Sequence, residues 1–264
     1  MLKNGPLALA FNALVVTFVL APLVVVCLVA FTPDSTLTIP TTQFSLRWFH
    51  AVFEHADFMQ AFRNSLLLAA LSATIAVALA VPAAIAITRY RFPGRDALNG
   101  LFLSPLMIPH LVLGVALLRF FALMGVAGSF TWLVVSHVVV VTPYVMRLII
   151  GALVGFDRSV EHAALSLNAS RATVFFKVTL PLIIPGVSGG WLLAFINSFD
   201  ELTMSVFITA PSTVTLPVRM YMYATESIDP MMAAVSALVI LLTAVTMLLL
   251  DRVYGLDRVL VGQK

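Results

Sequence analysis

The chain has 264 residues, of which 61% are hydrophobic and only 10% are charged. A soluble domain has about 45–50% apolar and about 25% charged residues, so this composition excludes an ordinary soluble protein, and it equally excludes a disordered chain. The net charge of +3 is too small to indicate a nucleic-acid-binding protein. Cys27 is the single cysteine, which excludes an intrachain disulfide. We therefore expect a polytopic protein embedded in the lipid bilayer.

Apolar segments recur along the chain, each with roughly the 20 residues needed to cross a hydrocarbon layer of about 30 Å. They cover residues 7–31, 65–87, 98–118, 131–154, 187–208 and 231–250. The first follows Lys3 and has no cleavage site of small residues, which favours a retained helix over a secretory signal. The pattern predicts an all-α fold in which residues 1–264 form a single transmembrane domain of six transmembrane helices.

Basic residues between these segments indicate the orientation of the chain. With the N-terminus inside, Arg47, Arg63 and Arg219 lie outside, and ten basic residues lie in the cytoplasm. The ten are Lys3, Arg89, Arg91, Arg95, Arg158, Arg171, Lys177, Arg252, Arg258 and Lys264. This excess predicts cytoplasmic positions for both termini. In the external loop 32–62, Trp48, Phe49 and Phe53 predict an amphipathic segment at the membrane surface.

Residues 155–180 form the only long cytoplasmic loop of this arrangement. Asp157 or Ser159 is a suitable N-cap, and Glu161 then lies in the first helical turn, where the helix dipole favours an acidic side chain. Asn168 can adopt the left-handed conformation that ends a helix, and Ser170 can cap the next one. The loop is therefore predicted to form two short helices that meet at a bend.

The residues of this loop resemble a known motif. Glu161-His-Ala-Ala-x-x-Leu-Asn-Ala-Ser170, followed by Val178-Thr-Leu-Pro-Leu182, is similar to the EAA loop of binding-protein-dependent ABC importer permeases. The resemblance covers most of the chain, and it implies the MetI-like permease fold in a bacterial inner (plasma) membrane. It also implies that the loop docks on a cytoplasmic ATPase. The coupling residues it indicates are Glu161, His162, Ala163, Ala164, Leu167 and Asn168.

This loop departs from the family pattern at two positions. His162 occupies the place where the motif has Glu, and Asn168 replaces a Gly. One residue corresponds to about 100° of helix rotation, so the sequence leaves open whether Glu161 replaces the missing carboxylate. A generic amphipathic loop helix is the alternative interpretation of the segment.

Two acidic residues, Asp200 and Glu201, lie within the fifth apolar segment. A central acidic residue costs about 2.5–3.5 kcal/mol on insertion scales, so two adjacent ones require a compensating role. Their spacing with Asn197 and Met204 places all four on one helix face, with Ser198 beside it. An anionic stripe of this kind favours a cationic solute. The alternative is a structural role, in which the acids pair with Arg119, Arg147 or a partner subunit.

The same region resembles permeases of spermidine/putrescine-type importers, through Ser198-Phe-Asp-Glu201 and the later Leu216-Pro217. The resemblance implies an ABC importer permease for a polyamine, with Asn197, Ser198, Asp200 and Glu201 along the substrate path. An opine or an amino-acid-like solute is the alternative cargo. An ion-coupled secondary transporter would explain the acids but not the loop, and an intramembrane enzyme fits least because adjacent acids on one helix make a poor catalytic pair.

The sequence indicates a transport subunit without catalytic residues of its own. It contains no Gly-x-x-x-x-Gly-Lys-Ser/Thr loop, so ATP and Mg²⁺ are expected on a partner ATPase, and no cofactor is expected in this chain. The resemblance implies a homologous second permease, two cytoplasmic ATPase subunits and an extracytoplasmic solute-binding protein. His110 and His137 are predicted to be helix-packing residues rather than metal ligands.

Overall fold

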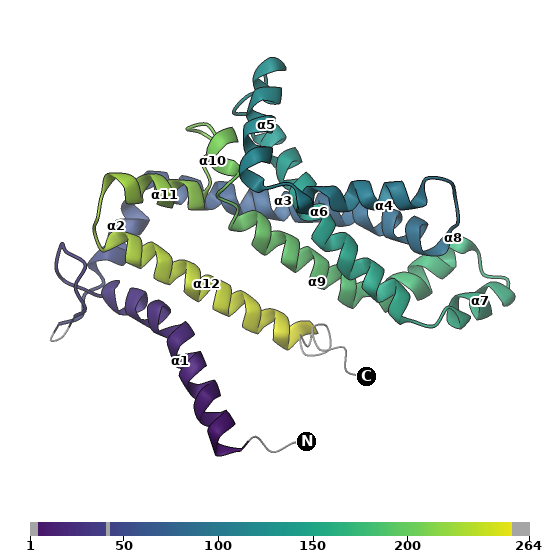
Figure 1. Ribbon diagram of the computed structural model, residues 1–264, viewed down its shortest axis with the longest axis horizontal. Coiled ribbons are helices and arrows are strands. Elements are labelled where there is room, and N and C mark those ends of the chain that lie inside the picture. The colour runs from purple at the N-terminus through teal and green to yellow at the C-terminus, as the bar shows by residue number, and fades with distance from the viewer. Residues whose placement is uncertain (1–4, 41–42, 255–264) are drawn as a thin grey trace. The chain divides into compact units, whose positions relative to one another are not determined.

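The structure is a computed structural model that describes residues 5–40 and 43–254, and every regular element in this part of the chain is helical (Figure 1). Four helices are long and apolar enough to cross a membrane: α1 (Pro6–Val29), α3 (Ala56–Arg89), α6 (Phe130–Gly155) and the helical stretch Arg171–Phe199. The all-α prediction is therefore confirmed for the described residues.

Fewer than six helices of the described residues are long and apolar enough to be full spans. A bent pair, Arg95–Met107 and His110–Leu123, adds a fifth span if it is counted as one. Helix α12 (Met231–Tyr254) covers the sixth predicted segment, but its apolar portion Met231–Thr246 is shorter than a full span. Six spans therefore stay a prediction.

Two of the predicted continuous helices are broken. The third segment divides into α4 (Arg95–Leu103), the 3-10 turn η1 (Ser104–Met107) and α5 (His110–Leu123), and the chain bends by 103° before α5. The fifth divides into α9 (Leu180–Phe199) and the short α10 (Ser205–Ile208). Irregular backbone at membrane depth needs protein or water around it, so the two breaks are candidates for a functional site.

Residues Gln60–Val218 belong to one of two compact units, and its centre is the packing of α6 against α9. Gly186 makes this contact possible, because a Cβ there would meet Ala152 Cβ at 2.6 Å and the Leu148 carbonyl oxygen at 2.9 Å. Alanines at helical spacing on α3 complete the core around α6 and α9. They are Ala73, Ala76, Ala80 and Ala84.

At one end of this unit, the loop predicted to be cytoplasmic forms α7 (Ser159–Ser166), α8 (Arg171–Val174) and a π-helical turn, η2 (Phe175–Thr179), that leads into α9. The two short helices and the bend between them were predicted from the sequence, and Figure 1 shows them beyond the ends of α6 and α9. The π-helical turn was not predicted. Such turns are rare and frequently occur at functional sites.

The other compact unit consists of residues up to Met59 together with Arg219–Asp251. It contains α1, α2 (Arg47–Glu54), the start of α3, the end of α11 (Leu216–Glu226) and most of α12. The predicted amphipathic segment is α2, and its Trp48 is buried and donates from Nε1 to the Asp34 carbonyl oxygen at 3.1 Å. Arg219 forms an ion pair with Asp57 at 2.7 Å.

Candidate functional site

The first part of the candidate site is the break after α9, where the chain turns through residues 200–204 before α10 begins. Gly114 of α5 lies directly against this turn, because a Cβ there would approach the Met204 backbone to 3.0 Å. A glycine at this position therefore allows the two backbones to come together. The break in the fifth segment thus packs on the helix that follows the break in the third.

Glu201 connects these two breaks. Its Oε1 accepts a hydrogen bond from the Met204 backbone N–H at 2.7 Å, and its Oε2 lies 2.6 Å from His110 Nδ1 at the start of α5. The Glu201 side chain is only 8% exposed. A buried carboxylate requires partners of this kind, since an unpaired charge in a region without water carries a large free-energy cost. The imidazole and the backbone N–H therefore hold Glu201 in place.

His137 of α6 bridges the break from its other side. Its Nδ1 lies 2.8 Å from Ser198 Oγ on α9, and its Nε2 lies 3.0 Å from Ser205 Oγ on α10. All three side chains are buried. An imidazole has two ring nitrogens that can each form a hydrogen bond, so one residue joins the end of α9 to the start of α10. The prediction that His110 and His137 are hydrogen-bonded packing residues agrees with these contacts.

The prediction that Asn197, Asp200, Glu201 and Met204 share one helix face is wrong, because the helix ends at Phe199. The spacing argument assumed a continuous helix, whereas the Glu201 carboxylate binds the Met204 N–H and ends the helical pattern there. Asp200 is exposed, while Ser198 and Glu201 are buried. The substrate-path residues therefore separate into an accessible carboxylate and a buried polar network.

Asn197 lies half-buried one turn before the break, and its Nδ2 donates to the Leu193 carbonyl oxygen at 2.8 Å. Among the described residues, neither Arg119 nor Arg147 forms an ion pair with Asp200 or Glu201. The partner that Glu201 has instead is His110, which the sequence analysis did not include in the site. The sequence does indicate that His110 begins a helix, because Pro109 immediately before it is typical of a helix start.

The second part of the candidate site is the loop between α6 and α9. Asp157 accepts hydrogen bonds from the Ser159 hydroxyl at 2.7 Å and from the Ser159 backbone N–H at 2.9 Å, and these contacts lower the pKa of the Asp157 carboxyl. Asn168 ends α7 with a left-handed φ of 65°. Ser170 Oγ accepts from the Thr173 N–H at 3.2 Å and caps α8. The predicted end of the helix at Asn168 and the cap at Ser170 are confirmed. The predicted N-cap is wrong, because Arg158 occupies the N-cap position of α7 without a side-chain hydrogen bond, and Ser159 is its first residue.

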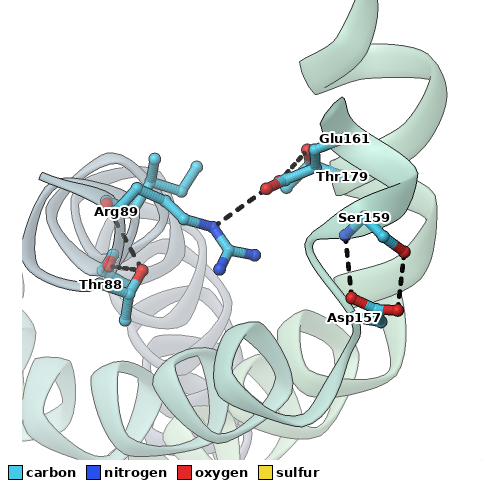
Figure 2. Close-up of polar contacts among 8 residues, drawn as sticks. Thr88, Arg89, Asp157, Ser159, Glu161 and Thr179 are labelled. Atoms are coloured by element: carbon cyan, nitrogen blue, oxygen red, sulfur yellow. Dashed lines mark hydrogen bonds and ion pairs between the residues drawn. The ribbon is translucent and has the colours of Figure 1, made fainter. Parts of the chain in front are cut away.

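Glu161 is bound within the chain, as Figure 2 shows. Its Oε1 accepts a hydrogen bond from the Thr179 hydroxyl at 2.7 Å, and its Oε2 lies 3.4 Å from Arg89 Nε at the end of α3. The Arg89 guanidinium also lies over the Phe156 ring, 4.8 Å from its centroid. Glu161 therefore ties α7 to α3 and to the turn that leads into α9. Arg89 and Thr179 were not among the predicted site residues.

The other predicted coupling residues are more accessible. His162, Ala163 and Asn168 are exposed, and Leu167 is 85% exposed. Ala164 is half-buried. Leu167 is therefore an exposed apolar side chain at the end of α7, next to exposed small residues of the same helix. Within residues 5–40 and 43–254, no group of His, Cys, Asp or Glu side chains is placed to hold a metal ion.

The candidate site thus has two parts, a broken helix with a buried acid and a loop of two short helices. Comparison with known proteins identifies the family of the chain. Residues 76–255 match the family described as the binding-protein-dependent transport system inner membrane component. The chain belongs to this family. It is thus a multi-pass inner membrane permease.

Relatives of this permease include polyamine permeases. It is 33% identical over 202 residues to the spermidine/putrescine transport system permease protein PotC of Escherichia coli (strain K12), covering 76% of each chain. It is 33% identical over 233 residues to the putrescine transport system permease protein PotI of the same strain, covering 85% of this chain and 82% of the relative. A bacterial ABC transporter that imports alginate has the same fold, with a TM-score of 0.72, 14% identity and 94% coverage of both chains.

Proposed function

We propose that this permease is the membrane-spanning subunit of an ATP-driven importer for a cationic small solute of the polyamine class. The names of the two polyamine permease relatives support this cargo. Several features of the site support it independently, and the position of Asp200 carries the most weight.

Asp200 is an exposed carboxylate where a membrane-depth helix ends. Intramembrane carboxylates generally face a bundle interior or a water-filled path. Its neighbour Glu201 is engaged by His110 and the Met204 N–H, so Asp200 is the carboxylate with capacity to bind a passing ammonium group. Broken helices are also where transporter substrate sites are generally found. We therefore assign the cation contact to Asp200, with Asn197 one turn away, and a supporting role to Ser198 and Glu201.

The energy for transport is assigned to partner subunits. We propose that α7 docks on a cytoplasmic ATPase through His162, Ala163, Ala164, Leu167 and Asn168, and that ATP and Mg²⁺ bind there. A solute-binding protein outside and a second permease complete the assembly. Support comes from the exposure of this face of the loop and from the family, whose description names a binding-protein-dependent transport system.

The decisive experiment is polyamine uptake by the complete complex in proteoliposomes, comparing the unmodified permease with Asp200→Asn. Loss of one charge-assisted contact corresponds to about 1.5–3 kcal/mol, so we expect uptake efficiency to fall by about 10- to 100-fold. Asp96→Asn is the matched control, because Asp96 is an exposed acid in α4, outside both parts of the site.

Unchanged polyamine uptake by Asp200→Asn in a normally assembled complex would contradict the assignment of the cation contact. If the unmodified complex imports an opine or an amino acid but no polyamine, the proposed cargo is wrong while the transport role stands. Uptake by the purified permease alone, without nucleotide or partners, would instead support an ion-coupled transporter.

A further inference from the structure

A basic cavity lies beside the coupling helix, on the side of α7 that faces the end of α3. Its volume is about 260 Å³, and its charged lining residues are Arg89, Arg158, Glu161 and Arg171. The cavity also contacts His162 and Leu165 of α7. Three arginines and one glutamate therefore line the cavity, and the excess of positive charge favours an anionic occupant.

The carboxylate in the cavity is already engaged. Glu161 accepts from the Thr179 hydroxyl at 2.7 Å and lies 3.4 Å from Arg89 Nε. The Arg89 side chain is only 10% exposed, and within the described residues its buried Nη2 has no hydrogen-bond partner. Buried polar groups are nearly always hydrogen-bonded, and a buried charge without full pairing is costly. A single distant carboxylate therefore leaves the Arg89 guanidinium incompletely satisfied.

We propose that this cavity receives an acidic side chain, Asp or Glu, from the cytoplasmic ATPase. The inference rests on the proposed function, because it needs that partner at α7. The cavity is lined by α7 and α8 together with the end of α3 and η2, and His162 is both exposed and part of the lining, so a protein seated on α7 at His162 would lie beside the cavity. Arg158 and Arg171 are exposed at this opening, and guanidinium groups bind carboxylates through paired hydrogen bonds.

The proposal assigns the charges at this contact in a definite direction. The permease contributes cations and the ATPase contributes the carboxylate, while Glu161 stays bound to Arg89 and Thr179 inside the permease. Electrostatic complementarity of this kind fixes the register of two docking surfaces and makes their association dependent on salt. It also gives Glu161 a positioning role in place of a direct contact with the partner.

Zero-length crosslinking in the assembled complex tests the proposal. We would prepare Arg158→Lys and Arg171→Lys in a Lys177→Arg background and treat the complex with a carbodiimide, which joins an amine to a carboxylate in direct contact. We expect an amide between either introduced amine and an Asp or Glu of the ATPase, identified by peptide mass spectrometry. Arg95→Lys is the control, because Arg95 lines a separate basic cavity of about 300 Å³ with Arg91.

A second measurement covers the possibility that lysine does not reach the carboxylate. The Arg158→Gln/Arg171→Gln permease should bind the ATPase at least about tenfold more weakly at low salt, and this difference should shrink as salt rises. An assembled complex without the amide, and with unchanged ATPase affinity, overturns the proposal. So does an amide to the headgroup of phosphatidylserine, which would make the occupant a lipid. An unmodified permease that never co-purifies with an ATPase contradicts the proposed function itself.

Discussion

Asp200 and Glu201 are adjacent in the chain, yet their carboxylates lie in different surroundings. Glu201 is buried against His110 and the Met204 N–H, whereas Asp200 is exposed. The difference arises because the helix ends between Phe199 and Asp200, so that the two side chains no longer follow the 100° step of a helix. One acid is bound at the break, and the other is the exposed carboxylate to which we assign the cation contact.

His137 is the residue on which the geometry of this break depends most, because it bonds to Ser198 and Ser205 on the two sides. Interhelical hydrogen bonds in membranes contribute about 0.6–1.7 kcal/mol each, so His137→Ala should lower the free energy of unfolding by about 1–3 kcal/mol. Denaturant titration of the purified permease in micelles measures this. The exposed His162→Ala is the control, and an unchanged free energy in His137→Ala would contradict the bridging role.

A pH-dependent contribution is expected from Tyr223 in the other compact unit. The pKa of Tyr223 is raised to about 12. The main cause is burial of the side chain, and the second is the hydrogen bond from the Tyr223 hydroxyl to Asp229 Oδ2 at 2.5 Å. In an unfolded chain tyrosine titrates near pH 10, so the folded state binds more protons between these values. The contribution of Tyr223 to stability is therefore complete below about pH 10 and decreases as the pH rises towards 12.

Tyr223→Phe keeps the ring contact with Phe58 and removes the ionisable group. Ultraviolet absorbance of the phenolate should show one tyrosine fewer titrating near pH 12 in this variant. Its free energy of unfolding should also fall less steeply above pH 10 than that of the unmodified permease. If both proteins titrate alike, Tyr223 is not the shifted group.

At the scale of helices, the contact of α6 with α9 depends on Gly186. An added Cβ would lie 2.9 Å from the Leu148 carbonyl oxygen, which belongs to the backbone and moves only with the whole helix. Overpacking of this kind costs about 1–3 kcal/mol, so Gly186→Ala should lower the melting temperature of the purified permease. Gly151→Ala in α6 is a matched control, because nothing lies within 4 Å of a Cβ there. Equal melting temperatures would contradict the close approach.

The elements differ in how far they follow from the sequence. The first, second and fourth long helices, the left-handed end at Asn168 and the cap at Ser170 depend on local chemistry, and these predictions are confirmed. The breaks after Phe199 and before His110 depend on contacts between distant residues, such as Glu201 with His110, which hydrophobic periodicity does not contain. For the same reason the sequence left open whether Glu161 replaces the missing carboxylate of the motif, and the contacts with Arg89 and Thr179 that hold it within the chain were not predicted.

At the scale of the permease, the Glu161 contacts connect α7 to the helix that ends at the break, within one compact unit. Thr179 immediately precedes α9, which runs as one helix from Leu180 to Phe199 and ends at Asp200. Arg89 ends α3, whose alanines pack with α6 and α9. α9 is therefore a continuous helix between Thr179, which Glu161 contacts, and the break at Asp200.

Ala163→Glu tests whether this loop is where the ATPase acts. Ala163 is exposed on α7, so a glutamate there should leave membrane insertion and the melting temperature unchanged. Its larger charged side chain would prevent close approach of the partner, and substrate-stimulated ATP hydrolysis by the assembled complex should fall to the basal rate together with uptake. The exposed Ala97→Glu in α4 makes the same chemical change away from the loop and should transport normally. Unmodified rates of uptake in Ala163→Glu would remove α7 from the coupling surface, because a contact that tolerates a new charge at its centre is not closely packed.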